Sequence, residues 1–148
     1  MFYYARALEN ANKTRQTQLF MNLYENYHSH EFRMKWHGIM QREWTDYEDW
    51  QRKYGQTTED LAAHTSMLSF FNGIGVLLHR KLIDVEMVDD LISVNIRGYW
   101  KKYGSLIIRS REIIDEPKLY FYTEYLYNEI MKKYDKAPDI SKLMYRST

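Results

Sequence analysis

The chain contains no cysteine, and this absence excludes more chemistry than any other feature of its composition. Disulfide scaffolds, thiolate nucleophiles, cysteine-ligated zinc sites and iron–sulfur clusters all require this residue. The sequence contains no complete metal or cofactor motif of another kind, because a His-Glu-x-x-His run and a phosphate-binding loop are both missing. We therefore expect no cofactor and no metal site.

Proline and glycine are also scarce, with two prolines and six glycines in 148 residues. Both residues interrupt helices, so their scarcity predicts long, uninterrupted ones. No stretch of useful length alternates between apolar and polar residues, which is the pattern of a half-buried strand. The sequence predicts an all-α fold, a bundle of about five or six helices.

The chain lacks an excess of charge of either sign. It carries 21 Lys and Arg against 20 Asp and Glu, a net charge of +1. This balance gives no general attraction to nucleic acid, which we do not expect as a partner. The sequence as printed shows no run of 18 apolar residues and no signal-peptide pattern, so we expect no membrane span within it.

Apolar spacing and capping residues predict the positions of six helices. Thr45, Thr57 and Asp84 are the expected N-caps, and Gly104 with Ser105 is the expected bend in the longest helix. We expect one helical domain over residues 1–134, followed by a poorly ordered tail over residues 135–148. The predicted helices cover residues 5–28, 31–44, 46–54, 58–81, 85–114 and 118–133.

The first predicted helix has two different halves. Residues 5–18 are polar on every face, and apolar spacing begins only at Leu19. A helix that is polar all round bridges through solvent or lacks its partner, so this pattern predicts a stalk followed by a docked half. Phe2, Tyr3 and Tyr4 precede Arg6, which is typical of the water-side end of a transmembrane helix. The alternative is that these aromatic residues pack on the domain.

The helix over residues 58–81 is apolar on nearly all sides, which predicts a buried central helix. It holds "FFNGIG", with glycines at positions 73 and 75. Small residues at positions 62, 66, 69 and 73 form a stripe that predicts close approach of a second helix. A phosphate-binding role is disfavoured, because no strand precedes the glycines and Leu78 occupies the third glycine position of that motif.

No group of residues predicts catalysis. Glu25 and His28 have the spacing of a di-iron ligand pair, but a second such pair is missing. Neighbouring side chains on a helix point apart, so His64 and Thr65 do not form a nucleophile–base pair. We assign no catalytic residue, and the balance favours a protein without enzyme activity.

Two groups of residues are candidate contact surfaces. The first is a basic group that could contact an anion or a partner, although a solvated helix face with ion pairs is the more usual explanation of such a group. Its members are Arg97, Trp100, Lys101, Arg109 and Arg111. The second is an aromatic stripe interleaved with acidic residues, which is either core or a binding patch. Its members are Trp44, Tyr47, Trp50 and Tyr54.

Four segments resemble a family of small prokaryotic proteins, many of them archaeal, that is catalogued as a domain of unknown function. They are "ANKTRQTQLFMNLYE", "FFNGIGVLLHRKLIDVEMVDDLI", "YWKKYGSLIIRSRE" and "YTEYLYNEI". In that family one N-terminal transmembrane helix typically precedes a helical cytosolic domain. The resemblance implies that residues 2–6 lie where a membrane helix ends and that residues 5–18 form its stalk.

These observations lead to two functional hypotheses. The first is a non-enzymatic helical interaction domain, the cytosolic part of a membrane-tethered protein, which binds a protein partner or a second copy of itself. The second is a soluble ligand-binding domain or small enzyme, with an aromatic-lined pocket between its helices. The sequence does not decide the oligomeric state.

Overall fold

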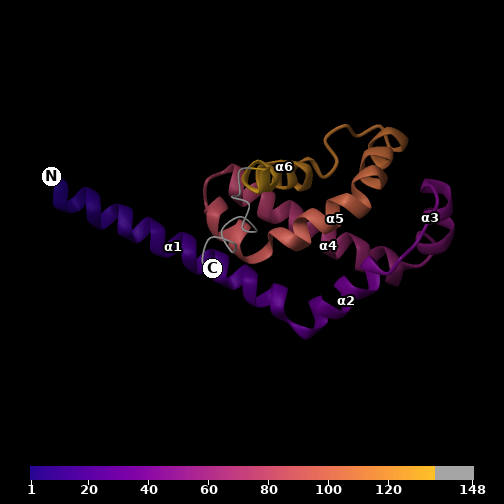
Figure 1. Cartoon of the computed structure of the whole chain (residues 1–148), viewed down its shortest axis with the longest axis horizontal. Helices are drawn as coiled ribbons and strands as arrows, with labels where there is room; N and C mark the ends of the chain where they lie inside the picture. Colours follow the sequence, from indigo (N-terminus) through magenta and orange to yellow (C-terminus); the bar gives the residue numbers. More distant parts are fainter. Residues whose placement is uncertain (136–148) are drawn as a thin grey trace, which may run out of the picture.

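The computed structural model describes residues 1–135 and shows six helices and no strand in that range (Figure 1). The all-α prediction is therefore confirmed. The tail predicted over residues 135–148 lies outside the described residues, except for Asp135, which ends the last helix. The helices are α1 (Phe2–His28), α2 (His30–Met40), α3 (Tyr47–Tyr54), α4 (Thr58–His79), α5 (Val85–Ile113) and α6 (Phe121–Asp135).

All six helices contribute to one hydrophobic core. Helix α6 packs against both α4 and α5, while α2 packs against α4. Aromatic rings connect these layers, because Phe71 of α4 lies 5.9 Å from Trp36 of α2 and 4.8 Å from Tyr99 of α5, measured between ring centroids. The short helix α3 lies at the end of the molecule far from the N-terminus (Figure 1).

Helix α1 leaves the body of the domain as a projecting arm (Figure 1). Every side chain in residues 2–15 is exposed. The first link to the body is Gln16, whose side-chain amide donates to the Lys81 carbonyl oxygen at 3.2 Å, and the first buried residue is Phe20. The free part is about 20 Å long at 1.5 Å per residue. The helix begins three residues before its predicted start.

Helix α2 ends at Met40, although the sequence predicted helix to residue 44. A continued helix would bond the Glu43 amide to the Ile39 carbonyl oxygen. Instead the Tyr103 hydroxyl donates to that oxygen, and the Glu43 amide donates to the Tyr54 hydroxyl at 3.2 Å. Two tyrosines from other helices thus replace the backbone bond, and the chain turns here.

Two of the three predicted N-caps, Thr57 and Asp84, are confirmed, and Ser29 is a further one. Ser29, Thr57 and Asp84 each accept a backbone amide hydrogen bond at the start of the helix that follows. The prediction that Thr45 caps α3 was wrong. Asp46 is the cap, because its carboxylate accepts from the Asp49 amide at 2.8 Å.

Two long helices end in turns that place a residue other than glycine in the left-handed region. Lys81 has φ 58° after α4, and the Leu82 amide closes the turn by donating to the Leu77 carbonyl oxygen at 2.9 Å. Asp115 has φ 52° after α5. Tyr120, at φ 51°, then delays the start of α6 to Phe121, three residues later than predicted.

The predicted close approach along the small-residue stripe of α4 was wrong. Its members at positions 62, 69 and 73 are exposed, and a Cβ atom added to Gly73 would meet nothing within 4 Å. The close approach occurs at Gly75 instead, where an added Cβ would overlap the Tyr122 carbonyl oxygen and lie 2.7 Å from its carbon. The start of α6 occupies this space.

Helix α5 runs without interruption past the bend expected at Gly104. A Cβ added there would lie 2.8 Å from the Trp100 ring, so this glycine makes room for an indole one turn earlier.

Helix α4 is long and apolar enough to cross a membrane by length and composition alone, with a window of mean hydropathy 1.4. Its Met67, Phe71 and Ile74 are fully buried in the core, which accounts for that apolarity.

Candidate functional site

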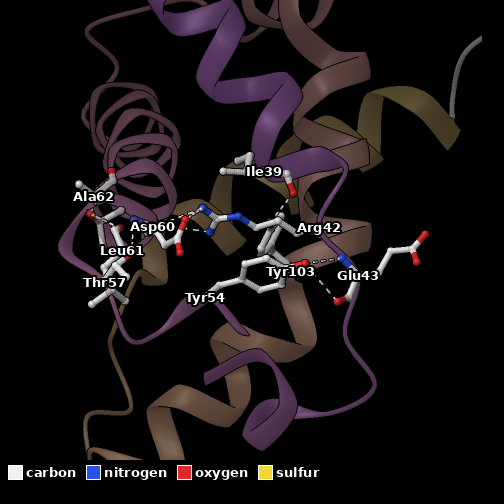
Figure 2. Close-up of polar contacts among 10 residues, drawn as sticks. Ile39, Arg42, Glu43, Tyr54, Thr57, Asp60, Leu61, Ala62 and Tyr103 are labelled. Carbon is white, nitrogen blue, oxygen red and sulfur yellow. Dashed lines mark hydrogen bonds and ion pairs between the residues drawn. The ribbon is translucent and has the colours of Figure 1, made fainter. Parts of the chain in front are cut away.

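A buried arginine joins the loop after α2 to the first turn of α4 (Figure 2). Both terminal nitrogens of Arg42 donate to the Asp60 carbonyl oxygen at 3.2 Å, and one also contacts the Asp60 carboxylate at 3.3 Å. Arg42 is only 9% exposed. A buried guanidinium needs such partners to compensate for its lost hydration. The pair fixes the loop, and through it the position of α3.

Tyrosines surround this arginine in Figure 2. The guanidinium carbon of Arg42 lies 4.8 Å from the centre of the Tyr54 ring, a cation–π distance. Tyr103 lies near them in the same view and donates to the Ile39 carbonyl oxygen. Burial raises the pKa of the Tyr103 hydroxyl, so this group stays protonated as a donor.

One turn after Asp60, His64 lies among aromatic rings. Its ring centroid is 5.1 Å from Trp50 of α3 and 4.9 Å from Tyr103 of α5. Burial, with a smaller contribution from the charge of Arg42, lowers the pKa of His64 to about 4. The imidazole is therefore neutral near pH 7.

Two polar atoms of this cluster are buried without a hydrogen-bond partner, namely Nδ1 of His64 and Nε1 of Trp50. The two residues are 7% and 4% exposed. Buried polar atoms are rarely left unpaired, since burial removes the water that would otherwise bind them. Their occurrence on two touching rings distinguishes this site from the rest of the core.

Both rings line a cavity of about 230 Å³ between α3, α4, α5 and the loop that leads to α6. Thr65 and Ser110, which also line it, donate their hydroxyl hydrogens to the carbonyl oxygens of Leu61 and Leu106 on their own helices. Among the described residues, none that lines this cavity is acidic. The full lining is Tyr47, Trp50, His64, Thr65, Leu68, Leu106, Ile107, Ser110, Ile114, Leu119 and Tyr120. The lining is thus mainly apolar and aromatic, with a few hydroxyl groups and one imidazole.

The family model for a domain of unknown function, DUF4760, matches residues 2–130. The chain belongs to the DUF4760 family. The matched range includes the projecting part of α1, the Arg42 junction and the whole cavity lining. No curated protein and no solved structure is significantly similar to the chain.

In this DUF4760 domain the basic group predicted from the sequence does not form one surface. The guanidinium of Arg97 stacks on the Tyr134 ring at 4.2 Å, and Trp100 stacks on Tyr127 at 5.7 Å. Both contacts hold α6 against α5. Lys101 is exposed.

The last two members of the basic group also have partners within the domain. Arg111 donates to the Leu119 carbonyl oxygen at 2.8 Å and pairs with Glu124 at 2.6 Å, which fixes the connection between α5 and α6. Arg109 pairs with Glu112 at 2.7 Å on the exposed side of α5. Most of the group is thus used to join helices.

The predicted aromatic stripe is divided between the core and the Arg42 junction. Trp50 is buried, and Trp44 is half-buried with its ring 4.9 Å from Tyr103. Tyr54 stacks on Arg42, as described above. The hydroxyl of Tyr47 accepts from the Gln51 amide at 2.7 Å, and Tyr47 forms part of the cavity lining. Two members of the stripe, Tyr47 and Trp50, line the cavity, and none of its four members is fully exposed.

An open cleft of about 600 Å³ lies beside the Arg42 junction, lined in part by Lys53 and Lys102. Lys53 pairs with Asp49 at 3.1 Å, and Lys102 lies 5.1 Å from the centre of the Trp44 ring.

Within residues 1–135, no three His, Asp or Glu side chains come close enough to hold a metal ion.

The sequence reasoning missed Arg42 and the burial of His64. A usable signal existed for the histidine, since His64, Leu68 and Phe71 are spaced four and three apart and so share one helix face. For the arginine no local signal existed. Its partner Asp60 lies 18 residues away, and the two meet only because α3 folds the chain back.

Proposed function

We propose that this DUF4760 domain is a non-enzymatic interaction domain that is carried at the cytosolic face of a membrane by α1. The observation that supports the proposal most directly is the projecting arm over residues 2–15. Its tip carries three large aromatic side chains that are largely exposed to solvent. Phe2, Tyr3 and Tyr4 are 89%, 79% and 78% exposed.

The arrangement of these aromatics favours a membrane over a protein groove. Successive residues on an α-helix are rotated by about 100°, so three in a row surround much of the helix instead of forming one face. A protein groove contacts one face, at spacings of three and four residues. Aromatic residues on several sides of a helix are typical of the belt at the membrane–water interface.

The charges of the arm support a cytosolic location. It carries three basic residues, Arg6, Lys13 and Arg15, and one acidic residue, Glu9, which gives a net charge of +2. Basic residues close to a membrane helix are enriched on the cytoplasmic side. The arm also gains little stability by itself, because polar helices of this length are marginal in water. A preceding membrane helix that continued into α1 would stabilise it.

Fractionation of the natural gene product tests the proposal. Cell lysate is separated by ultracentrifugation, and the membrane pellet is washed with alkaline carbonate. The tether predicts that the protein stays in the washed pellet. Recovery of the intact protein in the soluble fraction would contradict it.

Labelling of introduced cysteines then tests the position of the arm, and the absence of cysteine from the chain makes this simple. Tyr3→Cys and Asn12→Cys are prepared separately in the membrane-bound natural product, in a background free of other cysteines. A membrane-impermeant maleimide should react with position 12 several-fold faster than with position 3. Equal rates would contradict the placement of the tip at the membrane.

The second function class, a small-molecule-binding domain, is favoured by a different observation. The cavity beside α3 measures about 230 Å³ and has a mainly apolar lining. A tethered domain and a ligand-binding domain are compatible, because the cavity and the arm lie at different parts of the fold.

A further inference from the structure

We propose that the cavity between α3, α4 and α5 is the centre of a protein-binding surface, and that it receives one large apolar side chain from a partner segment rich in Lys and Arg. The inference rests on the proposed function as an interaction domain, but not on the membrane tether. None of the residues that line the cavity belongs to α1. Helix α3 lies at the end of the molecule far from the N-terminus, so an arm held at a membrane leaves this end free for a partner (Figure 1).

The cavity has the size of one large side chain. Its volume of about 230 Å³ is larger than the roughly 150 Å³ of an engineered cavity that holds benzene. The lining combines aliphatic side chains, such as Leu68, Leu106 and Ile107, with the rings of Trp50 and Tyr120. Apolar pockets hold the anchor residues that dominate the binding energy of many protein interfaces. A phenylalanine side chain, a benzene ring on one methylene group, fits this space.

The apolar surface continues out of the cavity, which favours a protein over a free small molecule. On α4, Leu61 is 37% exposed and lies one turn before Thr65 of the lining, on the same helix face. On α5, Ile114 belongs to the lining and is 57% exposed. A molecule inside the cavity leaves the outer parts of these side chains in water, whereas a segment that lies across the mouth covers them. Apolar surface that is contiguous with a pocket is typical of an interaction site.

The charges near the mouth indicate which partner fits. Five exposed charged residues lie within two positions of a lining residue and form no ion pair within residues 1–135. Four are acidic and one is basic, a local charge of −3, against +1 for the whole chain. Complementary charge selects partners and speeds their association, so a segment with Lys and Arg beside its apolar anchor is favoured. The five are Asp46, Glu48, Asp115, Glu116 and Lys118.

Four probes separate the contributions of the anchor, the charges and the rim. The first is the peptide Gly-Lys-Lys-Phe-Lys-Lys-Gly with both ends blocked, called the Phe peptide. The Ala peptide replaces its Phe by Ala, and the Glu peptide replaces each Lys by Glu. Toluene supplies the same ring without a peptide. Binding of each to the full chain is followed by the ¹⁵N–¹H signals of the four tryptophan indoles, and the signal of Trp50, which lines the cavity, is the one that disappears in Trp50→Phe.

We expect the Phe peptide to move the Trp50 signal more than the other three. The Ala peptide should bind about tenfold more weakly, because it leaves the cavity empty. The Glu peptide should bind about fivefold more weakly, and added salt should reduce this difference, because salt screens charges on exposed groups. Toluene should bind about fivefold more weakly than the Phe peptide, because it does not cover Leu61 and Ile114.

Three variants of the chain locate the surface. Ser110→Leu fills part of the cavity, so it should weaken the Phe peptide about tenfold and leave the Ala peptide unchanged. Ile114→Ser removes apolar surface at the mouth and should weaken the Phe peptide about threefold. Val94→Ser is the matched control, because Val94 is an apolar residue of α5 that is 69% exposed and outside the lining. It should leave binding unchanged. If Ser110→Leu fails to fold, the other two variants and the probes still decide.

Any of four results would overturn the proposal. The first two are an unmoved Trp50 signal at millimolar Phe peptide and equal binding of the Phe and Ala peptides. The third is toluene binding as tightly as the Phe peptide, which would assign the cavity to a free small molecule. The fourth is a Trp50 signal that moves when unlabelled chain is added, which would assign the surface to a second copy. A failed membrane fractionation would leave these results unaffected, so the tether and the partner surface fail separately.

Discussion

Helices α1 and α4 both lack a single dominant apolar face, for opposite reasons. Helix α1 separates its exposed and packed residues along its length, with a free first half and a docked second half. Helix α4 separates them around its circumference, so that one side, which includes Ala62, Ser69 and Gly73, remains exposed. Weak periodicity therefore means either no neighbours or neighbours on most sides. The apolar content of the segment distinguishes the two cases.

The contrast within α1 is tested by two truncations to alanine. Phe20→Ala should lower the free energy of unfolding by about 4 kcal/mol, because it leaves a cavity at a fully buried position. Leu8→Ala, the matched change in the projecting half, should alter it by less than about 0.5 kcal/mol. Urea unfolding followed by circular dichroism measures both. A large effect at position 8 would mean that the projecting half packs against something in solution.

The buried face of α4 should make stability depend on pH through His64. Its folded pKa of about 4 lies below the ordinary value of 6.5, so the unfolded chain takes up the proton first. Stability from this source is complete above pH 6.5, falls as the pH drops toward 4 and is constant below that. The total loss should be about 3 kcal/mol.

The control for this prediction is His64→Phe, which removes the titrating group and keeps a ring between Trp50 and Tyr103. The difference in unfolding free energy between this variant and the natural sequence should change across pH 4 to 6.5. Arg42 and Tyr103 are the other titratable groups that face the imidazole, and burial raises the pKa of the Tyr103 hydroxyl, which keeps it neutral in this range. A difference that is independent of pH would contradict the buried, neutral histidine.

The two faces of α4 are compared directly by their glycines. Gly75→Ala should destabilise the protein by about 2 kcal/mol, because the new methyl group meets the backbone of Tyr122. Gly73→Ala adds a methyl group to open space, so it should stabilise the helix by up to about 1 kcal/mol. Thermal unfolding of both variants gives the comparison. Effects of the same sign would mean that α6 does not contact α4 as described.

The end of α4 offers the smallest expected effect. Lys81 adopts a left-handed conformation that glycine adopts at less cost, so Lys81→Gly should raise stability by about 1 kcal/mol. Arg80→Gly is the matched control, because Arg80 has φ −81° and gains nothing from the change. It should be neutral or destabilising. Equal stabilisation by both changes would argue against the closing turn.

The sequence predicted the helices well and their contacts poorly. Capping residues and apolar spacing are local, so Thr57 and Asp84 were found as caps from the sequence alone. The end of α2 was misplaced because Tyr54 and Tyr103, distant in sequence, bond its last backbone groups. The cavity could not be predicted for the same reason, since four separate segments form its walls.

The projecting helix also has a mechanical consequence. Helix α1 contains neither proline nor glycine between Phe2 and His28, and its second half is fixed in the core by Phe20 and Tyr27. While the arm stays helical it therefore has no proline or glycine hinge, and its tip and the body move as one unit. A rotation of the tip about the helix axis would turn the whole domain through the same angle, and with it the direction in which the α3 cavity opens.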